Sequence, residues 1–279
     1  MEDYRLIDEK EIYNSFKKVI KPSDTTIVLY SGIWSFINKI NFKKNIGKKI
    51  LDIVENLVTP KRTLIIPSFS SGVFNKENKF DLKLSLDNKN GIISKEALKR
   101  NYYYRTPQPL HSYLVYGKKI KEIKNLSLKT SWGKTSILEW MRKNNSRICV
   151  LGIPWNKGCS YLHRFEEKFQ VPWRYFKTFE GKMYNNKKFI GYCKENKFSS
   201  PSNIVLNYDY KPLVNIMKKN KIFLKGNSNF FLESTKTKSI DSIANNFFKK
   251  SSKWEIIKNK SQVKRWIIKF KKSEIKKTN

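Results

Sequence analysis

Histidine and cysteine are scarce in this chain, and their scarcity restricts its chemistry. The 279 residues include two histidines, His111 and His163, and three cysteines, Cys149, Cys159 and Cys193. The cysteines are odd in number and form no Cys-x-x-Cys pair, so we expect reduced thiols and neither a disulfide framework nor a zinc site. We therefore expect no bound metal ion.

Acidic residues are also few. The chain has 23 aspartates and glutamates against 58 lysines and arginines, which gives a formal net charge of +35. A field of this sign attracts polyanions and repels cations. A basic nucleic-acid-binding protein is one class that fits this charge and the interleaved Tyr, Trp and Lys. We rank it below an enzyme, because no nucleic-acid-reading motif is present and the charge is spread along the chain.

Long hydrophobic runs are absent as well. No apolar stretch approaches the ~20 residues that a membrane-spanning helix needs, and the acidic, polar N-terminus is unlike a signal peptide. We therefore expect a cytoplasmic protein. With 39% hydrophobic and 14% aromatic residues, the chain is expected to fold around a substantial core.

The hydrophobic pattern predicts an α/β protein with a single domain over residues 1–279. Short apolar or β-branched runs predict strands at 25–30, 63–66, 113–117 and 148–151, and helical periodicity falls between them. The polar stretch 71–91 is predicted to be a long loop, and Ser94 is predicted to begin a helix. Residues 249–279 are predicted to form a basic amphipathic helix docked on the body. Contact of this helix with an anionic membrane surface is the weaker alternative.

The stretch from Arg147 to Gly181 carries the clearest chemical signal. A predicted strand ends at Gly152, and Ser160 is expected to cap a helix on which His163 and Glu166 share one face. A carboxylate beside an imidazole can orient the ring and support a proton on it, which suits acid–base catalysis. A surface or capping pair is the alternative. Cys159 as a thiol nucleophile is a weaker one.

The order of motifs in this stretch resembles the aminoglycoside 3-N-acetyltransferase family. The core motif stands here as Leu151-Gly152, Ser160-Tyr161-Leu162-His163, Glu166, Val171-Pro172-Trp173-Arg174-Tyr175 and Phe179-Glu180-Gly181. Upstream, Arg105 to Ser112 matches the family's Arg-Ser-x-His-Pro-x-His-Ser. Gly133 to Leu138 matches its Gly-x-x-Ser-Pro-Leu, and Tyr30-Ser31-Gly32 is a weakened form of its His-Ser-Ser. The motifs span about residues 24–181.

This resemblance implies a three-layer α/β/α fold with a central mixed sheet, unrelated to the GNAT fold, and transfer of an acetyl group from acetyl-CoA. His163 is expected to be the general base, with Glu166 orienting its ring. His111 and Ser112 would shape the acceptor site or help to hold the thioester. Ser68-Phe69-Ser70 resembles the family's Pro-Thr-Phe segment, which implies that Ser68 faces the cleft as a co-substrate contact; an ordinary strand-to-loop turn is the equal alternative.

Further contacts are expected from the residues themselves. Thr135 and Ser136 begin a predicted helix whose N-terminus suits phosphates or a pantetheine amide, and Ser31 is a candidate to contact the co-substrate. Tyr104 could stack on a sugar or base, although core packing is its default role. Gln108 stands where relatives have a histidine, and glutamine cannot gain a proton near neutral pH.

The acceptor is expected to be an amino sugar. Because the charge disfavours a polycation, and because Gln108 and Tyr30 depart from the family motifs, we predict a nucleotide-activated amino sugar destined for surface polysaccharide. The alternative is an aminoglycoside, with antibiotic resistance as the outcome.

Overall fold

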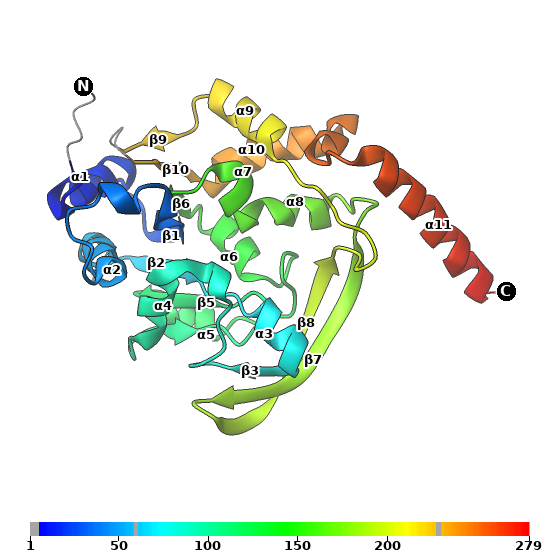
Figure 1. Ribbon diagram of the computed structural model, residues 1–279, viewed down its shortest axis with the longest axis horizontal. Coiled ribbons are helices and arrows are strands. Elements are labelled where there is room, and N and C mark those ends of the chain that lie inside the picture. The colour runs from blue at the N-terminus through cyan, green and yellow to red at the C-terminus, as the bar shows by residue number, and fades with distance from the viewer. Residues whose placement is uncertain (1–5, 59–60, 227–229, 279) are drawn as a thin grey trace.

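Figure 1 shows the computed structural model of the protein, which describes residues 6–58, 61–226 and 230–278. The helices are α1 (Glu9–Val19), α2 (Ile46–Val58), α3 (Ser71–Glu77), α4 (Gly91–Lys99), α5 (Ile120–Lys124), α6 (Ile137–Lys143), α7 (Trp155–Gly158), α8 (His163–Lys168), α9 (Lys211–Lys219), α10 (Thr237–Lys249) and α11 (Lys260–Thr278). The strands are β1 (Thr26–Ser31), β2 (Thr63–Pro67), β3 (Lys79–Asp81), β4 (Tyr104–Arg105), β5 (Tyr113–Gly117), β6 (Arg147–Leu151), β7 (Tyr175–Asn185), β8 (Lys188–Ser199), β9 (Leu224–Lys225) and β10 (Leu232–Lys236). Short 3₁₀ turns lie at Ile33–Ser35, Ile37–Lys39, Asn88–Asn90, Ser160–Leu162 and Ser251–Ile256.

A mixed sheet forms the centre of the molecule. Within the described residues it has seven strands in the order β4-β5-β2-β1-β6-β10-β9. β1 runs parallel to both β2 and β6, whereas the outer pairs are antiparallel. The carboxyl ends of β1, β2 and β6 therefore open at one edge, which is where open α/β sheets bind ligands.

Successive residues of the central strands face opposite helical layers. Ile27 and Leu29 of β1 belong to a core cluster with α1, α2 and α4. Val28 and Tyr30 belong to a second cluster with α6, α8, α9 and α10. This alternation follows from the two-residue period of a strand. It confirms the predicted three-layer α/β/α fold with a mixed sheet.

A long hairpin, β7–β8, forms a second sheet with β3 and curves along one side of the molecule (Figure 1). Its turn residues Asn186 and Lys187 both have positive φ, as a tight hairpin turn requires. The carboxylate of Asp81 accepts hydrogen bonds from the backbone N–H groups of both residues, at 3.0 and 2.7 Å. One aspartate of β3 thus fixes the tip of the hairpin.

The structure corrects three predictions about elements. The predicted loop 71–91 contains α3, β3 and a 3₁₀ turn, and the next helix begins at Gly91 rather than at Ser94. At the C-terminus a helix is present, but it begins at Lys260, because α10 ends at Lys249 and a 3₁₀ turn follows. Val263 is buried, Trp266 and Ile267 pack against the core, and Phe270 stacks on Tyr175 with ring centroids 6.0 Å apart, whereas the C-terminal part of α11 leads away from the body (Figure 1), so only the first part of this helix docks. In the described part of the chain, no helix is both long enough and apolar enough to cross a bilayer.

Candidate active site

A sharp turn after β6 brings α8 to the carboxyl edge of the parallel strands. Gly152 has a φ of 70°, and a Cβ atom there would lie 2.2 Å from the carbonyl oxygen of Gly32. Glycine is required in so close and left-handed a turn. The chain then passes through α7 and the turn Ser160–Leu162, and α8 begins at His163.

The predicted role of Ser160 as a helix cap is wrong. No side chain caps α8, and the Ser160 hydroxyl lies 2.9 Å from the hydroxyl of Tyr30 and 3.4 Å from that of Tyr113. Ser160 thus ties the start of α8 to the end of β1 and the start of β5. The Ser160 hydroxyl therefore bonds to hydroxyls from two distant segments rather than to the backbone at the start of its own helix.

His163 and Glu166 lie together as predicted, and Tyr210, Arg174 and Tyr208, whose hydroxyl donates to Glu166 Oε2 at 3.4 Å, complete the group. His163 Nδ1 is 3.4 Å from Glu166 Oε1 and 3.0 Å from the hydroxyl of Tyr210, which itself donates to Glu166 Oε1. Arg174 donates through Nε to Glu166 Oε2, and its Nη2 lies 3.3 Å from His163 Nδ1. Glu166 is fully buried, so its charge is held by a guanidinium and two phenols rather than by water.

Two possible acceptors and one donor face Nδ1 of His163: Glu166 Oε1 and the Tyr210 oxygen can accept a proton from it, whereas Arg174 Nη2 can only donate. Because Tyr210 gives its proton to Glu166, its oxygen is free to accept one from Nδ1. We therefore assign the imidazole proton to Nδ1, which leaves the lone pair on Nε2. Among the described residues no group hydrogen-bonds to Nε2, and 27% of the His163 side chain is exposed. This nitrogen can accept a proton from a bound molecule.

The surroundings keep His163 neutral and Glu166 ionised at pH 7. Burial lowers the pKa of His163 below 6.5, and Glu166 only partly opposes this. Burial alone would raise the pKa of Glu166, but Arg174 and the hydrogen bonds from His163 and Tyr210 lower it to about 2. A neutral imidazole held by an ionised carboxylate is the form that a general base requires.

His111 lies in the same cluster of rings but is itself buried. Its ring centroid is 4.1 Å from that of Trp132, which in turn is 5.3 Å from that of His163. His111 Nδ1 lies 3.3 Å from Oε1 of Glu195, a fully buried carboxylate. Burial, reinforced by Lys197, lowers the pKa of His111 to about 4. His111 is therefore a neutral wall of the site, separated from His163 by one indole.

A cleft of about 350 Å³ lies at the carboxyl ends of β1 and β2. Ser31, which was predicted to contact the co-substrate, lines this cleft together with Tyr30, Phe69, Lys89 and Lys157. Two lysines beside apolar walls are groups that suit the phosphates and the pantetheine chain of coenzyme A. Phe69 also meets His111 edge-on at 5.1 Å, which places the cleft next to the ring cluster.

Four of the predicted contact residues are buried in structural roles. Ser112 Oγ donates to the carbonyl of Ser68 at 2.6 Å and accepts from Arg105, so both serines belong to a buried network. Ser136 caps α6 by accepting from the N–H of Glu139. Gln108 Nε2 donates to the Thr130 carbonyl at 2.8 Å.

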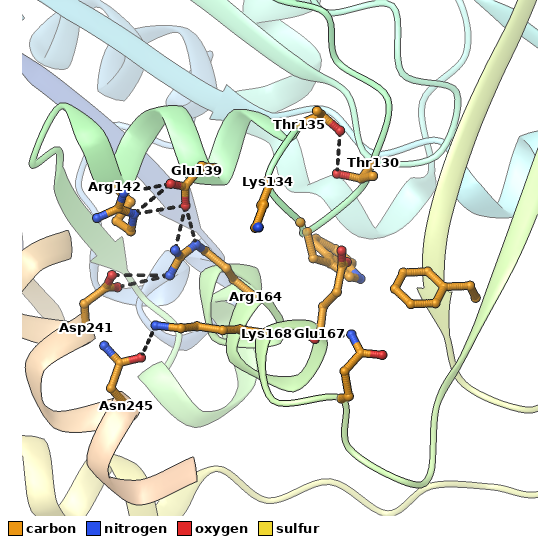
Figure 2. Close-up of a pocket in the computed structure, with 14 residues that line it drawn as sticks. Thr130, Lys134, Thr135, Glu139, Arg142, Arg164, Glu167, Lys168, Asp241 and Asn245 are labelled. Atoms are coloured by element: carbon orange, nitrogen blue, oxygen red, sulfur yellow. Dashed lines mark hydrogen bonds and ion pairs between the residues drawn. The ribbon is translucent and has the colours of Figure 1, made fainter. Parts of the chain in front are cut away.

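The two remaining predicted residues lie elsewhere. Tyr104 is on the edge strand β4, with the Lys124 ammonium 5.2 Å from its ring centroid. Thr135 lines a second, larger cavity (Figure 2). The sequence missed Tyr210, Trp132 and Glu195, which reach the two histidines across long stretches of chain. Arg174 belongs to one of the quoted motifs. Its positive charge could have indicated an ion-pair partner for Glu166.

In the described part of the chain, no three histidine, cysteine, aspartate or glutamate side chains gather in a way that could hold a metal ion. The group around His163 pairs a half-buried imidazole with a buried carboxylate beside the carboxyl edge of an α/β sheet. Solved structures with this architecture include aminoglycoside acetyltransferases. AAC-IIIb in binary complex with CoASH matches with a TM-score of 0.71 and 14% identity, over 88% of this chain and 97% of that one. AAC(3)-Xa matches with a TM-score of 0.69 and 16% identity, over 86% and 92%. The YokD protein from Bacillus subtilis matches with a TM-score of 0.66 and 14% identity, over 89% and 98%.

The family itself is shown by sequence. The model of the family described as aminoglycoside 3-N-acetyltransferase matches residues 34–223, so the chain belongs to that family. The protein is accordingly an acetyl-CoA-dependent N-acetyltransferase. Among curated proteins, no sequence matches it.

Proposed function

We propose that the protein acetylates an amino group of an aminoglycoside or a closely related amino sugar, with His163 as the general base. The observation that carries this proposal is the geometry of His163, Glu166, Arg174 and Tyr210 in a member of this family. An aminoglycoside is the first acceptor to consider, because AAC-VIa has been solved with sisomicin and an AAC(3)-IVa variant with a gentamicin.

The mechanism follows from the chemistry of an amine. An alkylamine is mostly protonated near pH 7, and the resulting ammonium has no lone pair on nitrogen until it loses a proton. Acetyl-CoA supplies a thioester carbonyl, at which the C–N bond forms as the C–S bond breaks and coenzyme A departs as a thiolate. His163 Nε2 takes the proton that the attacking nitrogen loses, and the imidazolium then returns a proton to the sulfur, so that coenzyme A is released as the thiol. Glu166 stabilises the resulting imidazolium, and Tyr210 and Arg174 hold the carboxylate in place.

A nucleotide-activated amino sugar is the second candidate. The net charge of +35 favours an anionic acceptor over a polycation. The aminoglycosides bound in two solved relatives nevertheless favour an aminoglycoside acceptor, and nothing in the fold points to surface polysaccharide.

The test is an acceptor panel with acetyl-CoA, read by release of the thiol. The panel contains sisomicin, gentamicin and kanamycin beside nucleotide 2-, 3- and 4-amino sugars. We expect turnover of at least one aminoglycoside, and turnover of the nucleotide sugars alone would reverse the ranking. His163→Ala should lose on the order of 100-fold or more in kcat, the usual scale for a general base.

The matched control is Lys182→Ala, an exposed residue of β7 outside the site, which should leave turnover unchanged. Melting curves would verify that both variants fold. Normal turnover by a folded His163→Ala protein would remove this histidine from the chemistry.

A further inference from the structure

A second cavity lies outside the group around His163. It has a volume of about 710 Å³, within the usual range for small-ligand sites, and is bounded by α6, α8, α10 and the loop before α6. Trp132 lines it, and the same indole contacts the ring of His163. One aromatic side chain therefore stands between this cavity and the proposed base.

Most charged groups on the cavity wall already have partners (Figure 2). Glu139 binds Arg142 and Arg164 at 2.7 and 2.6 Å, and Arg164 also contacts Asp241 at 3.3 Å. Lys168 donates to the amide oxygen of Asn245 at 2.6 Å. These pairs give the wall a fixed structure without any ligand.

Two charged residues of the wall differ from the others, because no dashed line in Figure 2 joins them to a partner. Oε2 of Glu167 is buried and accepts no hydrogen bond within the described part of the chain, although the residue is only 7% exposed. Lys134 is exposed, and no hydrogen bond or ion pair to its ammonium group occurs among the described residues. A buried carboxylate without a hydrogen-bond partner is costly, and a ligand hydroxyl that bonds to the carboxylate lowers that cost.

The backbone makes room for the Glu167 carboxylate. A Cβ atom on Gly133 would lie 2.0 Å from Glu167 Oε1, so the carboxylate packs directly on the glycine. Burial raises the pKa of Glu167 to about 7. Near neutral pH this group is therefore present in both protonation states, and a sugar hydroxyl can pair with either, since it donates and accepts.

The remaining features favour an anionic, ring-shaped ligand. The described residues that line the cavity include four basic side chains, Lys134, Arg142, Arg164 and Lys168, against three acidic ones, Glu139, Glu167 and Asp241. With Glu167 partly protonated, the balance is positive. Phe176 at the rim is 55% exposed and offers an aromatic face on which a sugar ring can stack.

We propose that this cavity is a second binding site, separate from the acetyl-transfer site, that takes a sugar phosphate. A hydroxyl of the sugar pairs with Glu167, and the phosphate pairs with Lys134. Trp132 lines this cavity and also contacts the ring of His163, so the two sites are neighbours.

The test is titration calorimetry of the full-length protein with glucose 6-phosphate at pH 7.5, with glucose and inorganic phosphate as probes that each lack one of the two groups. We expect the complete probe to bind at least tenfold more tightly than either part. Glu167→Met and Lys134→Met should each weaken it at least tenfold, the ordinary scale for a hydrogen bond to a charged group. Lys89→Met, in the cleft at the end of β1, is the matched control and should leave the Kd within twofold.

Separate arms distinguish this site from the co-substrate site, whose ligand also carries a phosphorylated sugar. Saturating coenzyme A should leave the Kd of the probe unchanged, and His163→Ala should not weaken it. Displacement of the probe by coenzyme A, or loss of binding in Lys89→Met alone, would overturn the proposal. So would equal affinity for phosphate alone, or the absence of any binding by the folded wild-type protein.

Discussion

At the scale of single residues, the active site depends on how Glu166 sets the state of His163. The imidazole is neutral because burial outweighs the attraction of one carboxylate, and the carboxylate is ionised because Arg174 neutralises it. The sequence predicted this histidine and this glutamate, because three-residue spacing places both on one helical face. It did not predict Tyr210 or Glu195, which lie 44 and 84 residues from their partners Glu166 and His111. No local pattern encodes such pairs.

The protonation of the two histidines can be measured directly. The imidazole NMR spectrum of this protein contains two rings, and we expect His163 to titrate below pH 6.5 and His111 near pH 4. Glu166→Gln removes the group that raises the pKa of His163, so His163 should then titrate at a still lower pH. An upward shift in that variant, or titration of His163 above pH 6.5 in the wild type, would contradict this account.

At the scale of elements, the strands were predictable and several connections were not. The runs at β1, β2, β5 and β6 are short, apolar and buried, so their pattern suffices. In the stretch 71–91, however, α3 is capped by Asp87, which lies 14 and 15 residues along the chain from the N–H groups of Val73 and Gly72. Ser160 likewise bonds to Tyr30 across 130 residues instead of capping its own helix. Tertiary partners overrode local signals in both places.

The hairpin β7–β8 offers a test of such a long-range contact. Asp81→Ala removes the acceptor for two N–H groups of the hairpin turn and two of the loop after β3. We expect faster hydrogen exchange at Asn186 and Lys187, and a loss of about 1.5–3 kcal/mol in the free energy of unfolding, the range for hydrogen bonds to a charged group.

The control for this test is Glu180→Gln, on the same hairpin. It breaks only a surface pair with Lys194, so it should cost about 0–1 kcal/mol. Equal stability of the two variants would show that Asp81 does not hold the turn.

At the scale of the whole molecule, the charge of +35 should govern how acceptors arrive. Charges outside the site act mainly by attracting or repelling a charged acceptor as it approaches. Salt screens this effect, because the Debye length falls to about 8 Å at physiological ionic strength. For an aminoglycoside, kcat/KM should therefore rise as salt screens repulsion. For a nucleotide amino sugar it should fall. Steady-state rates at low and physiological ionic strength would distinguish the two, and equal salt dependence for both acceptors would mean that the net charge has no part in selection.

The position of Trp132 between two imidazoles has an optical consequence. Its ring lies 4.1 Å from that of His111 and 5.3 Å from that of His163, centroid to centroid. A protonated imidazole quenches the fluorescence of a neighbouring indole, whereas a neutral one quenches it far less. The emission of Trp132, isolated as the difference between the wild type and Trp132→Phe, is thus a built-in reporter. We expect it to follow the charge on the His163 ring in real time, without a label and during turnover.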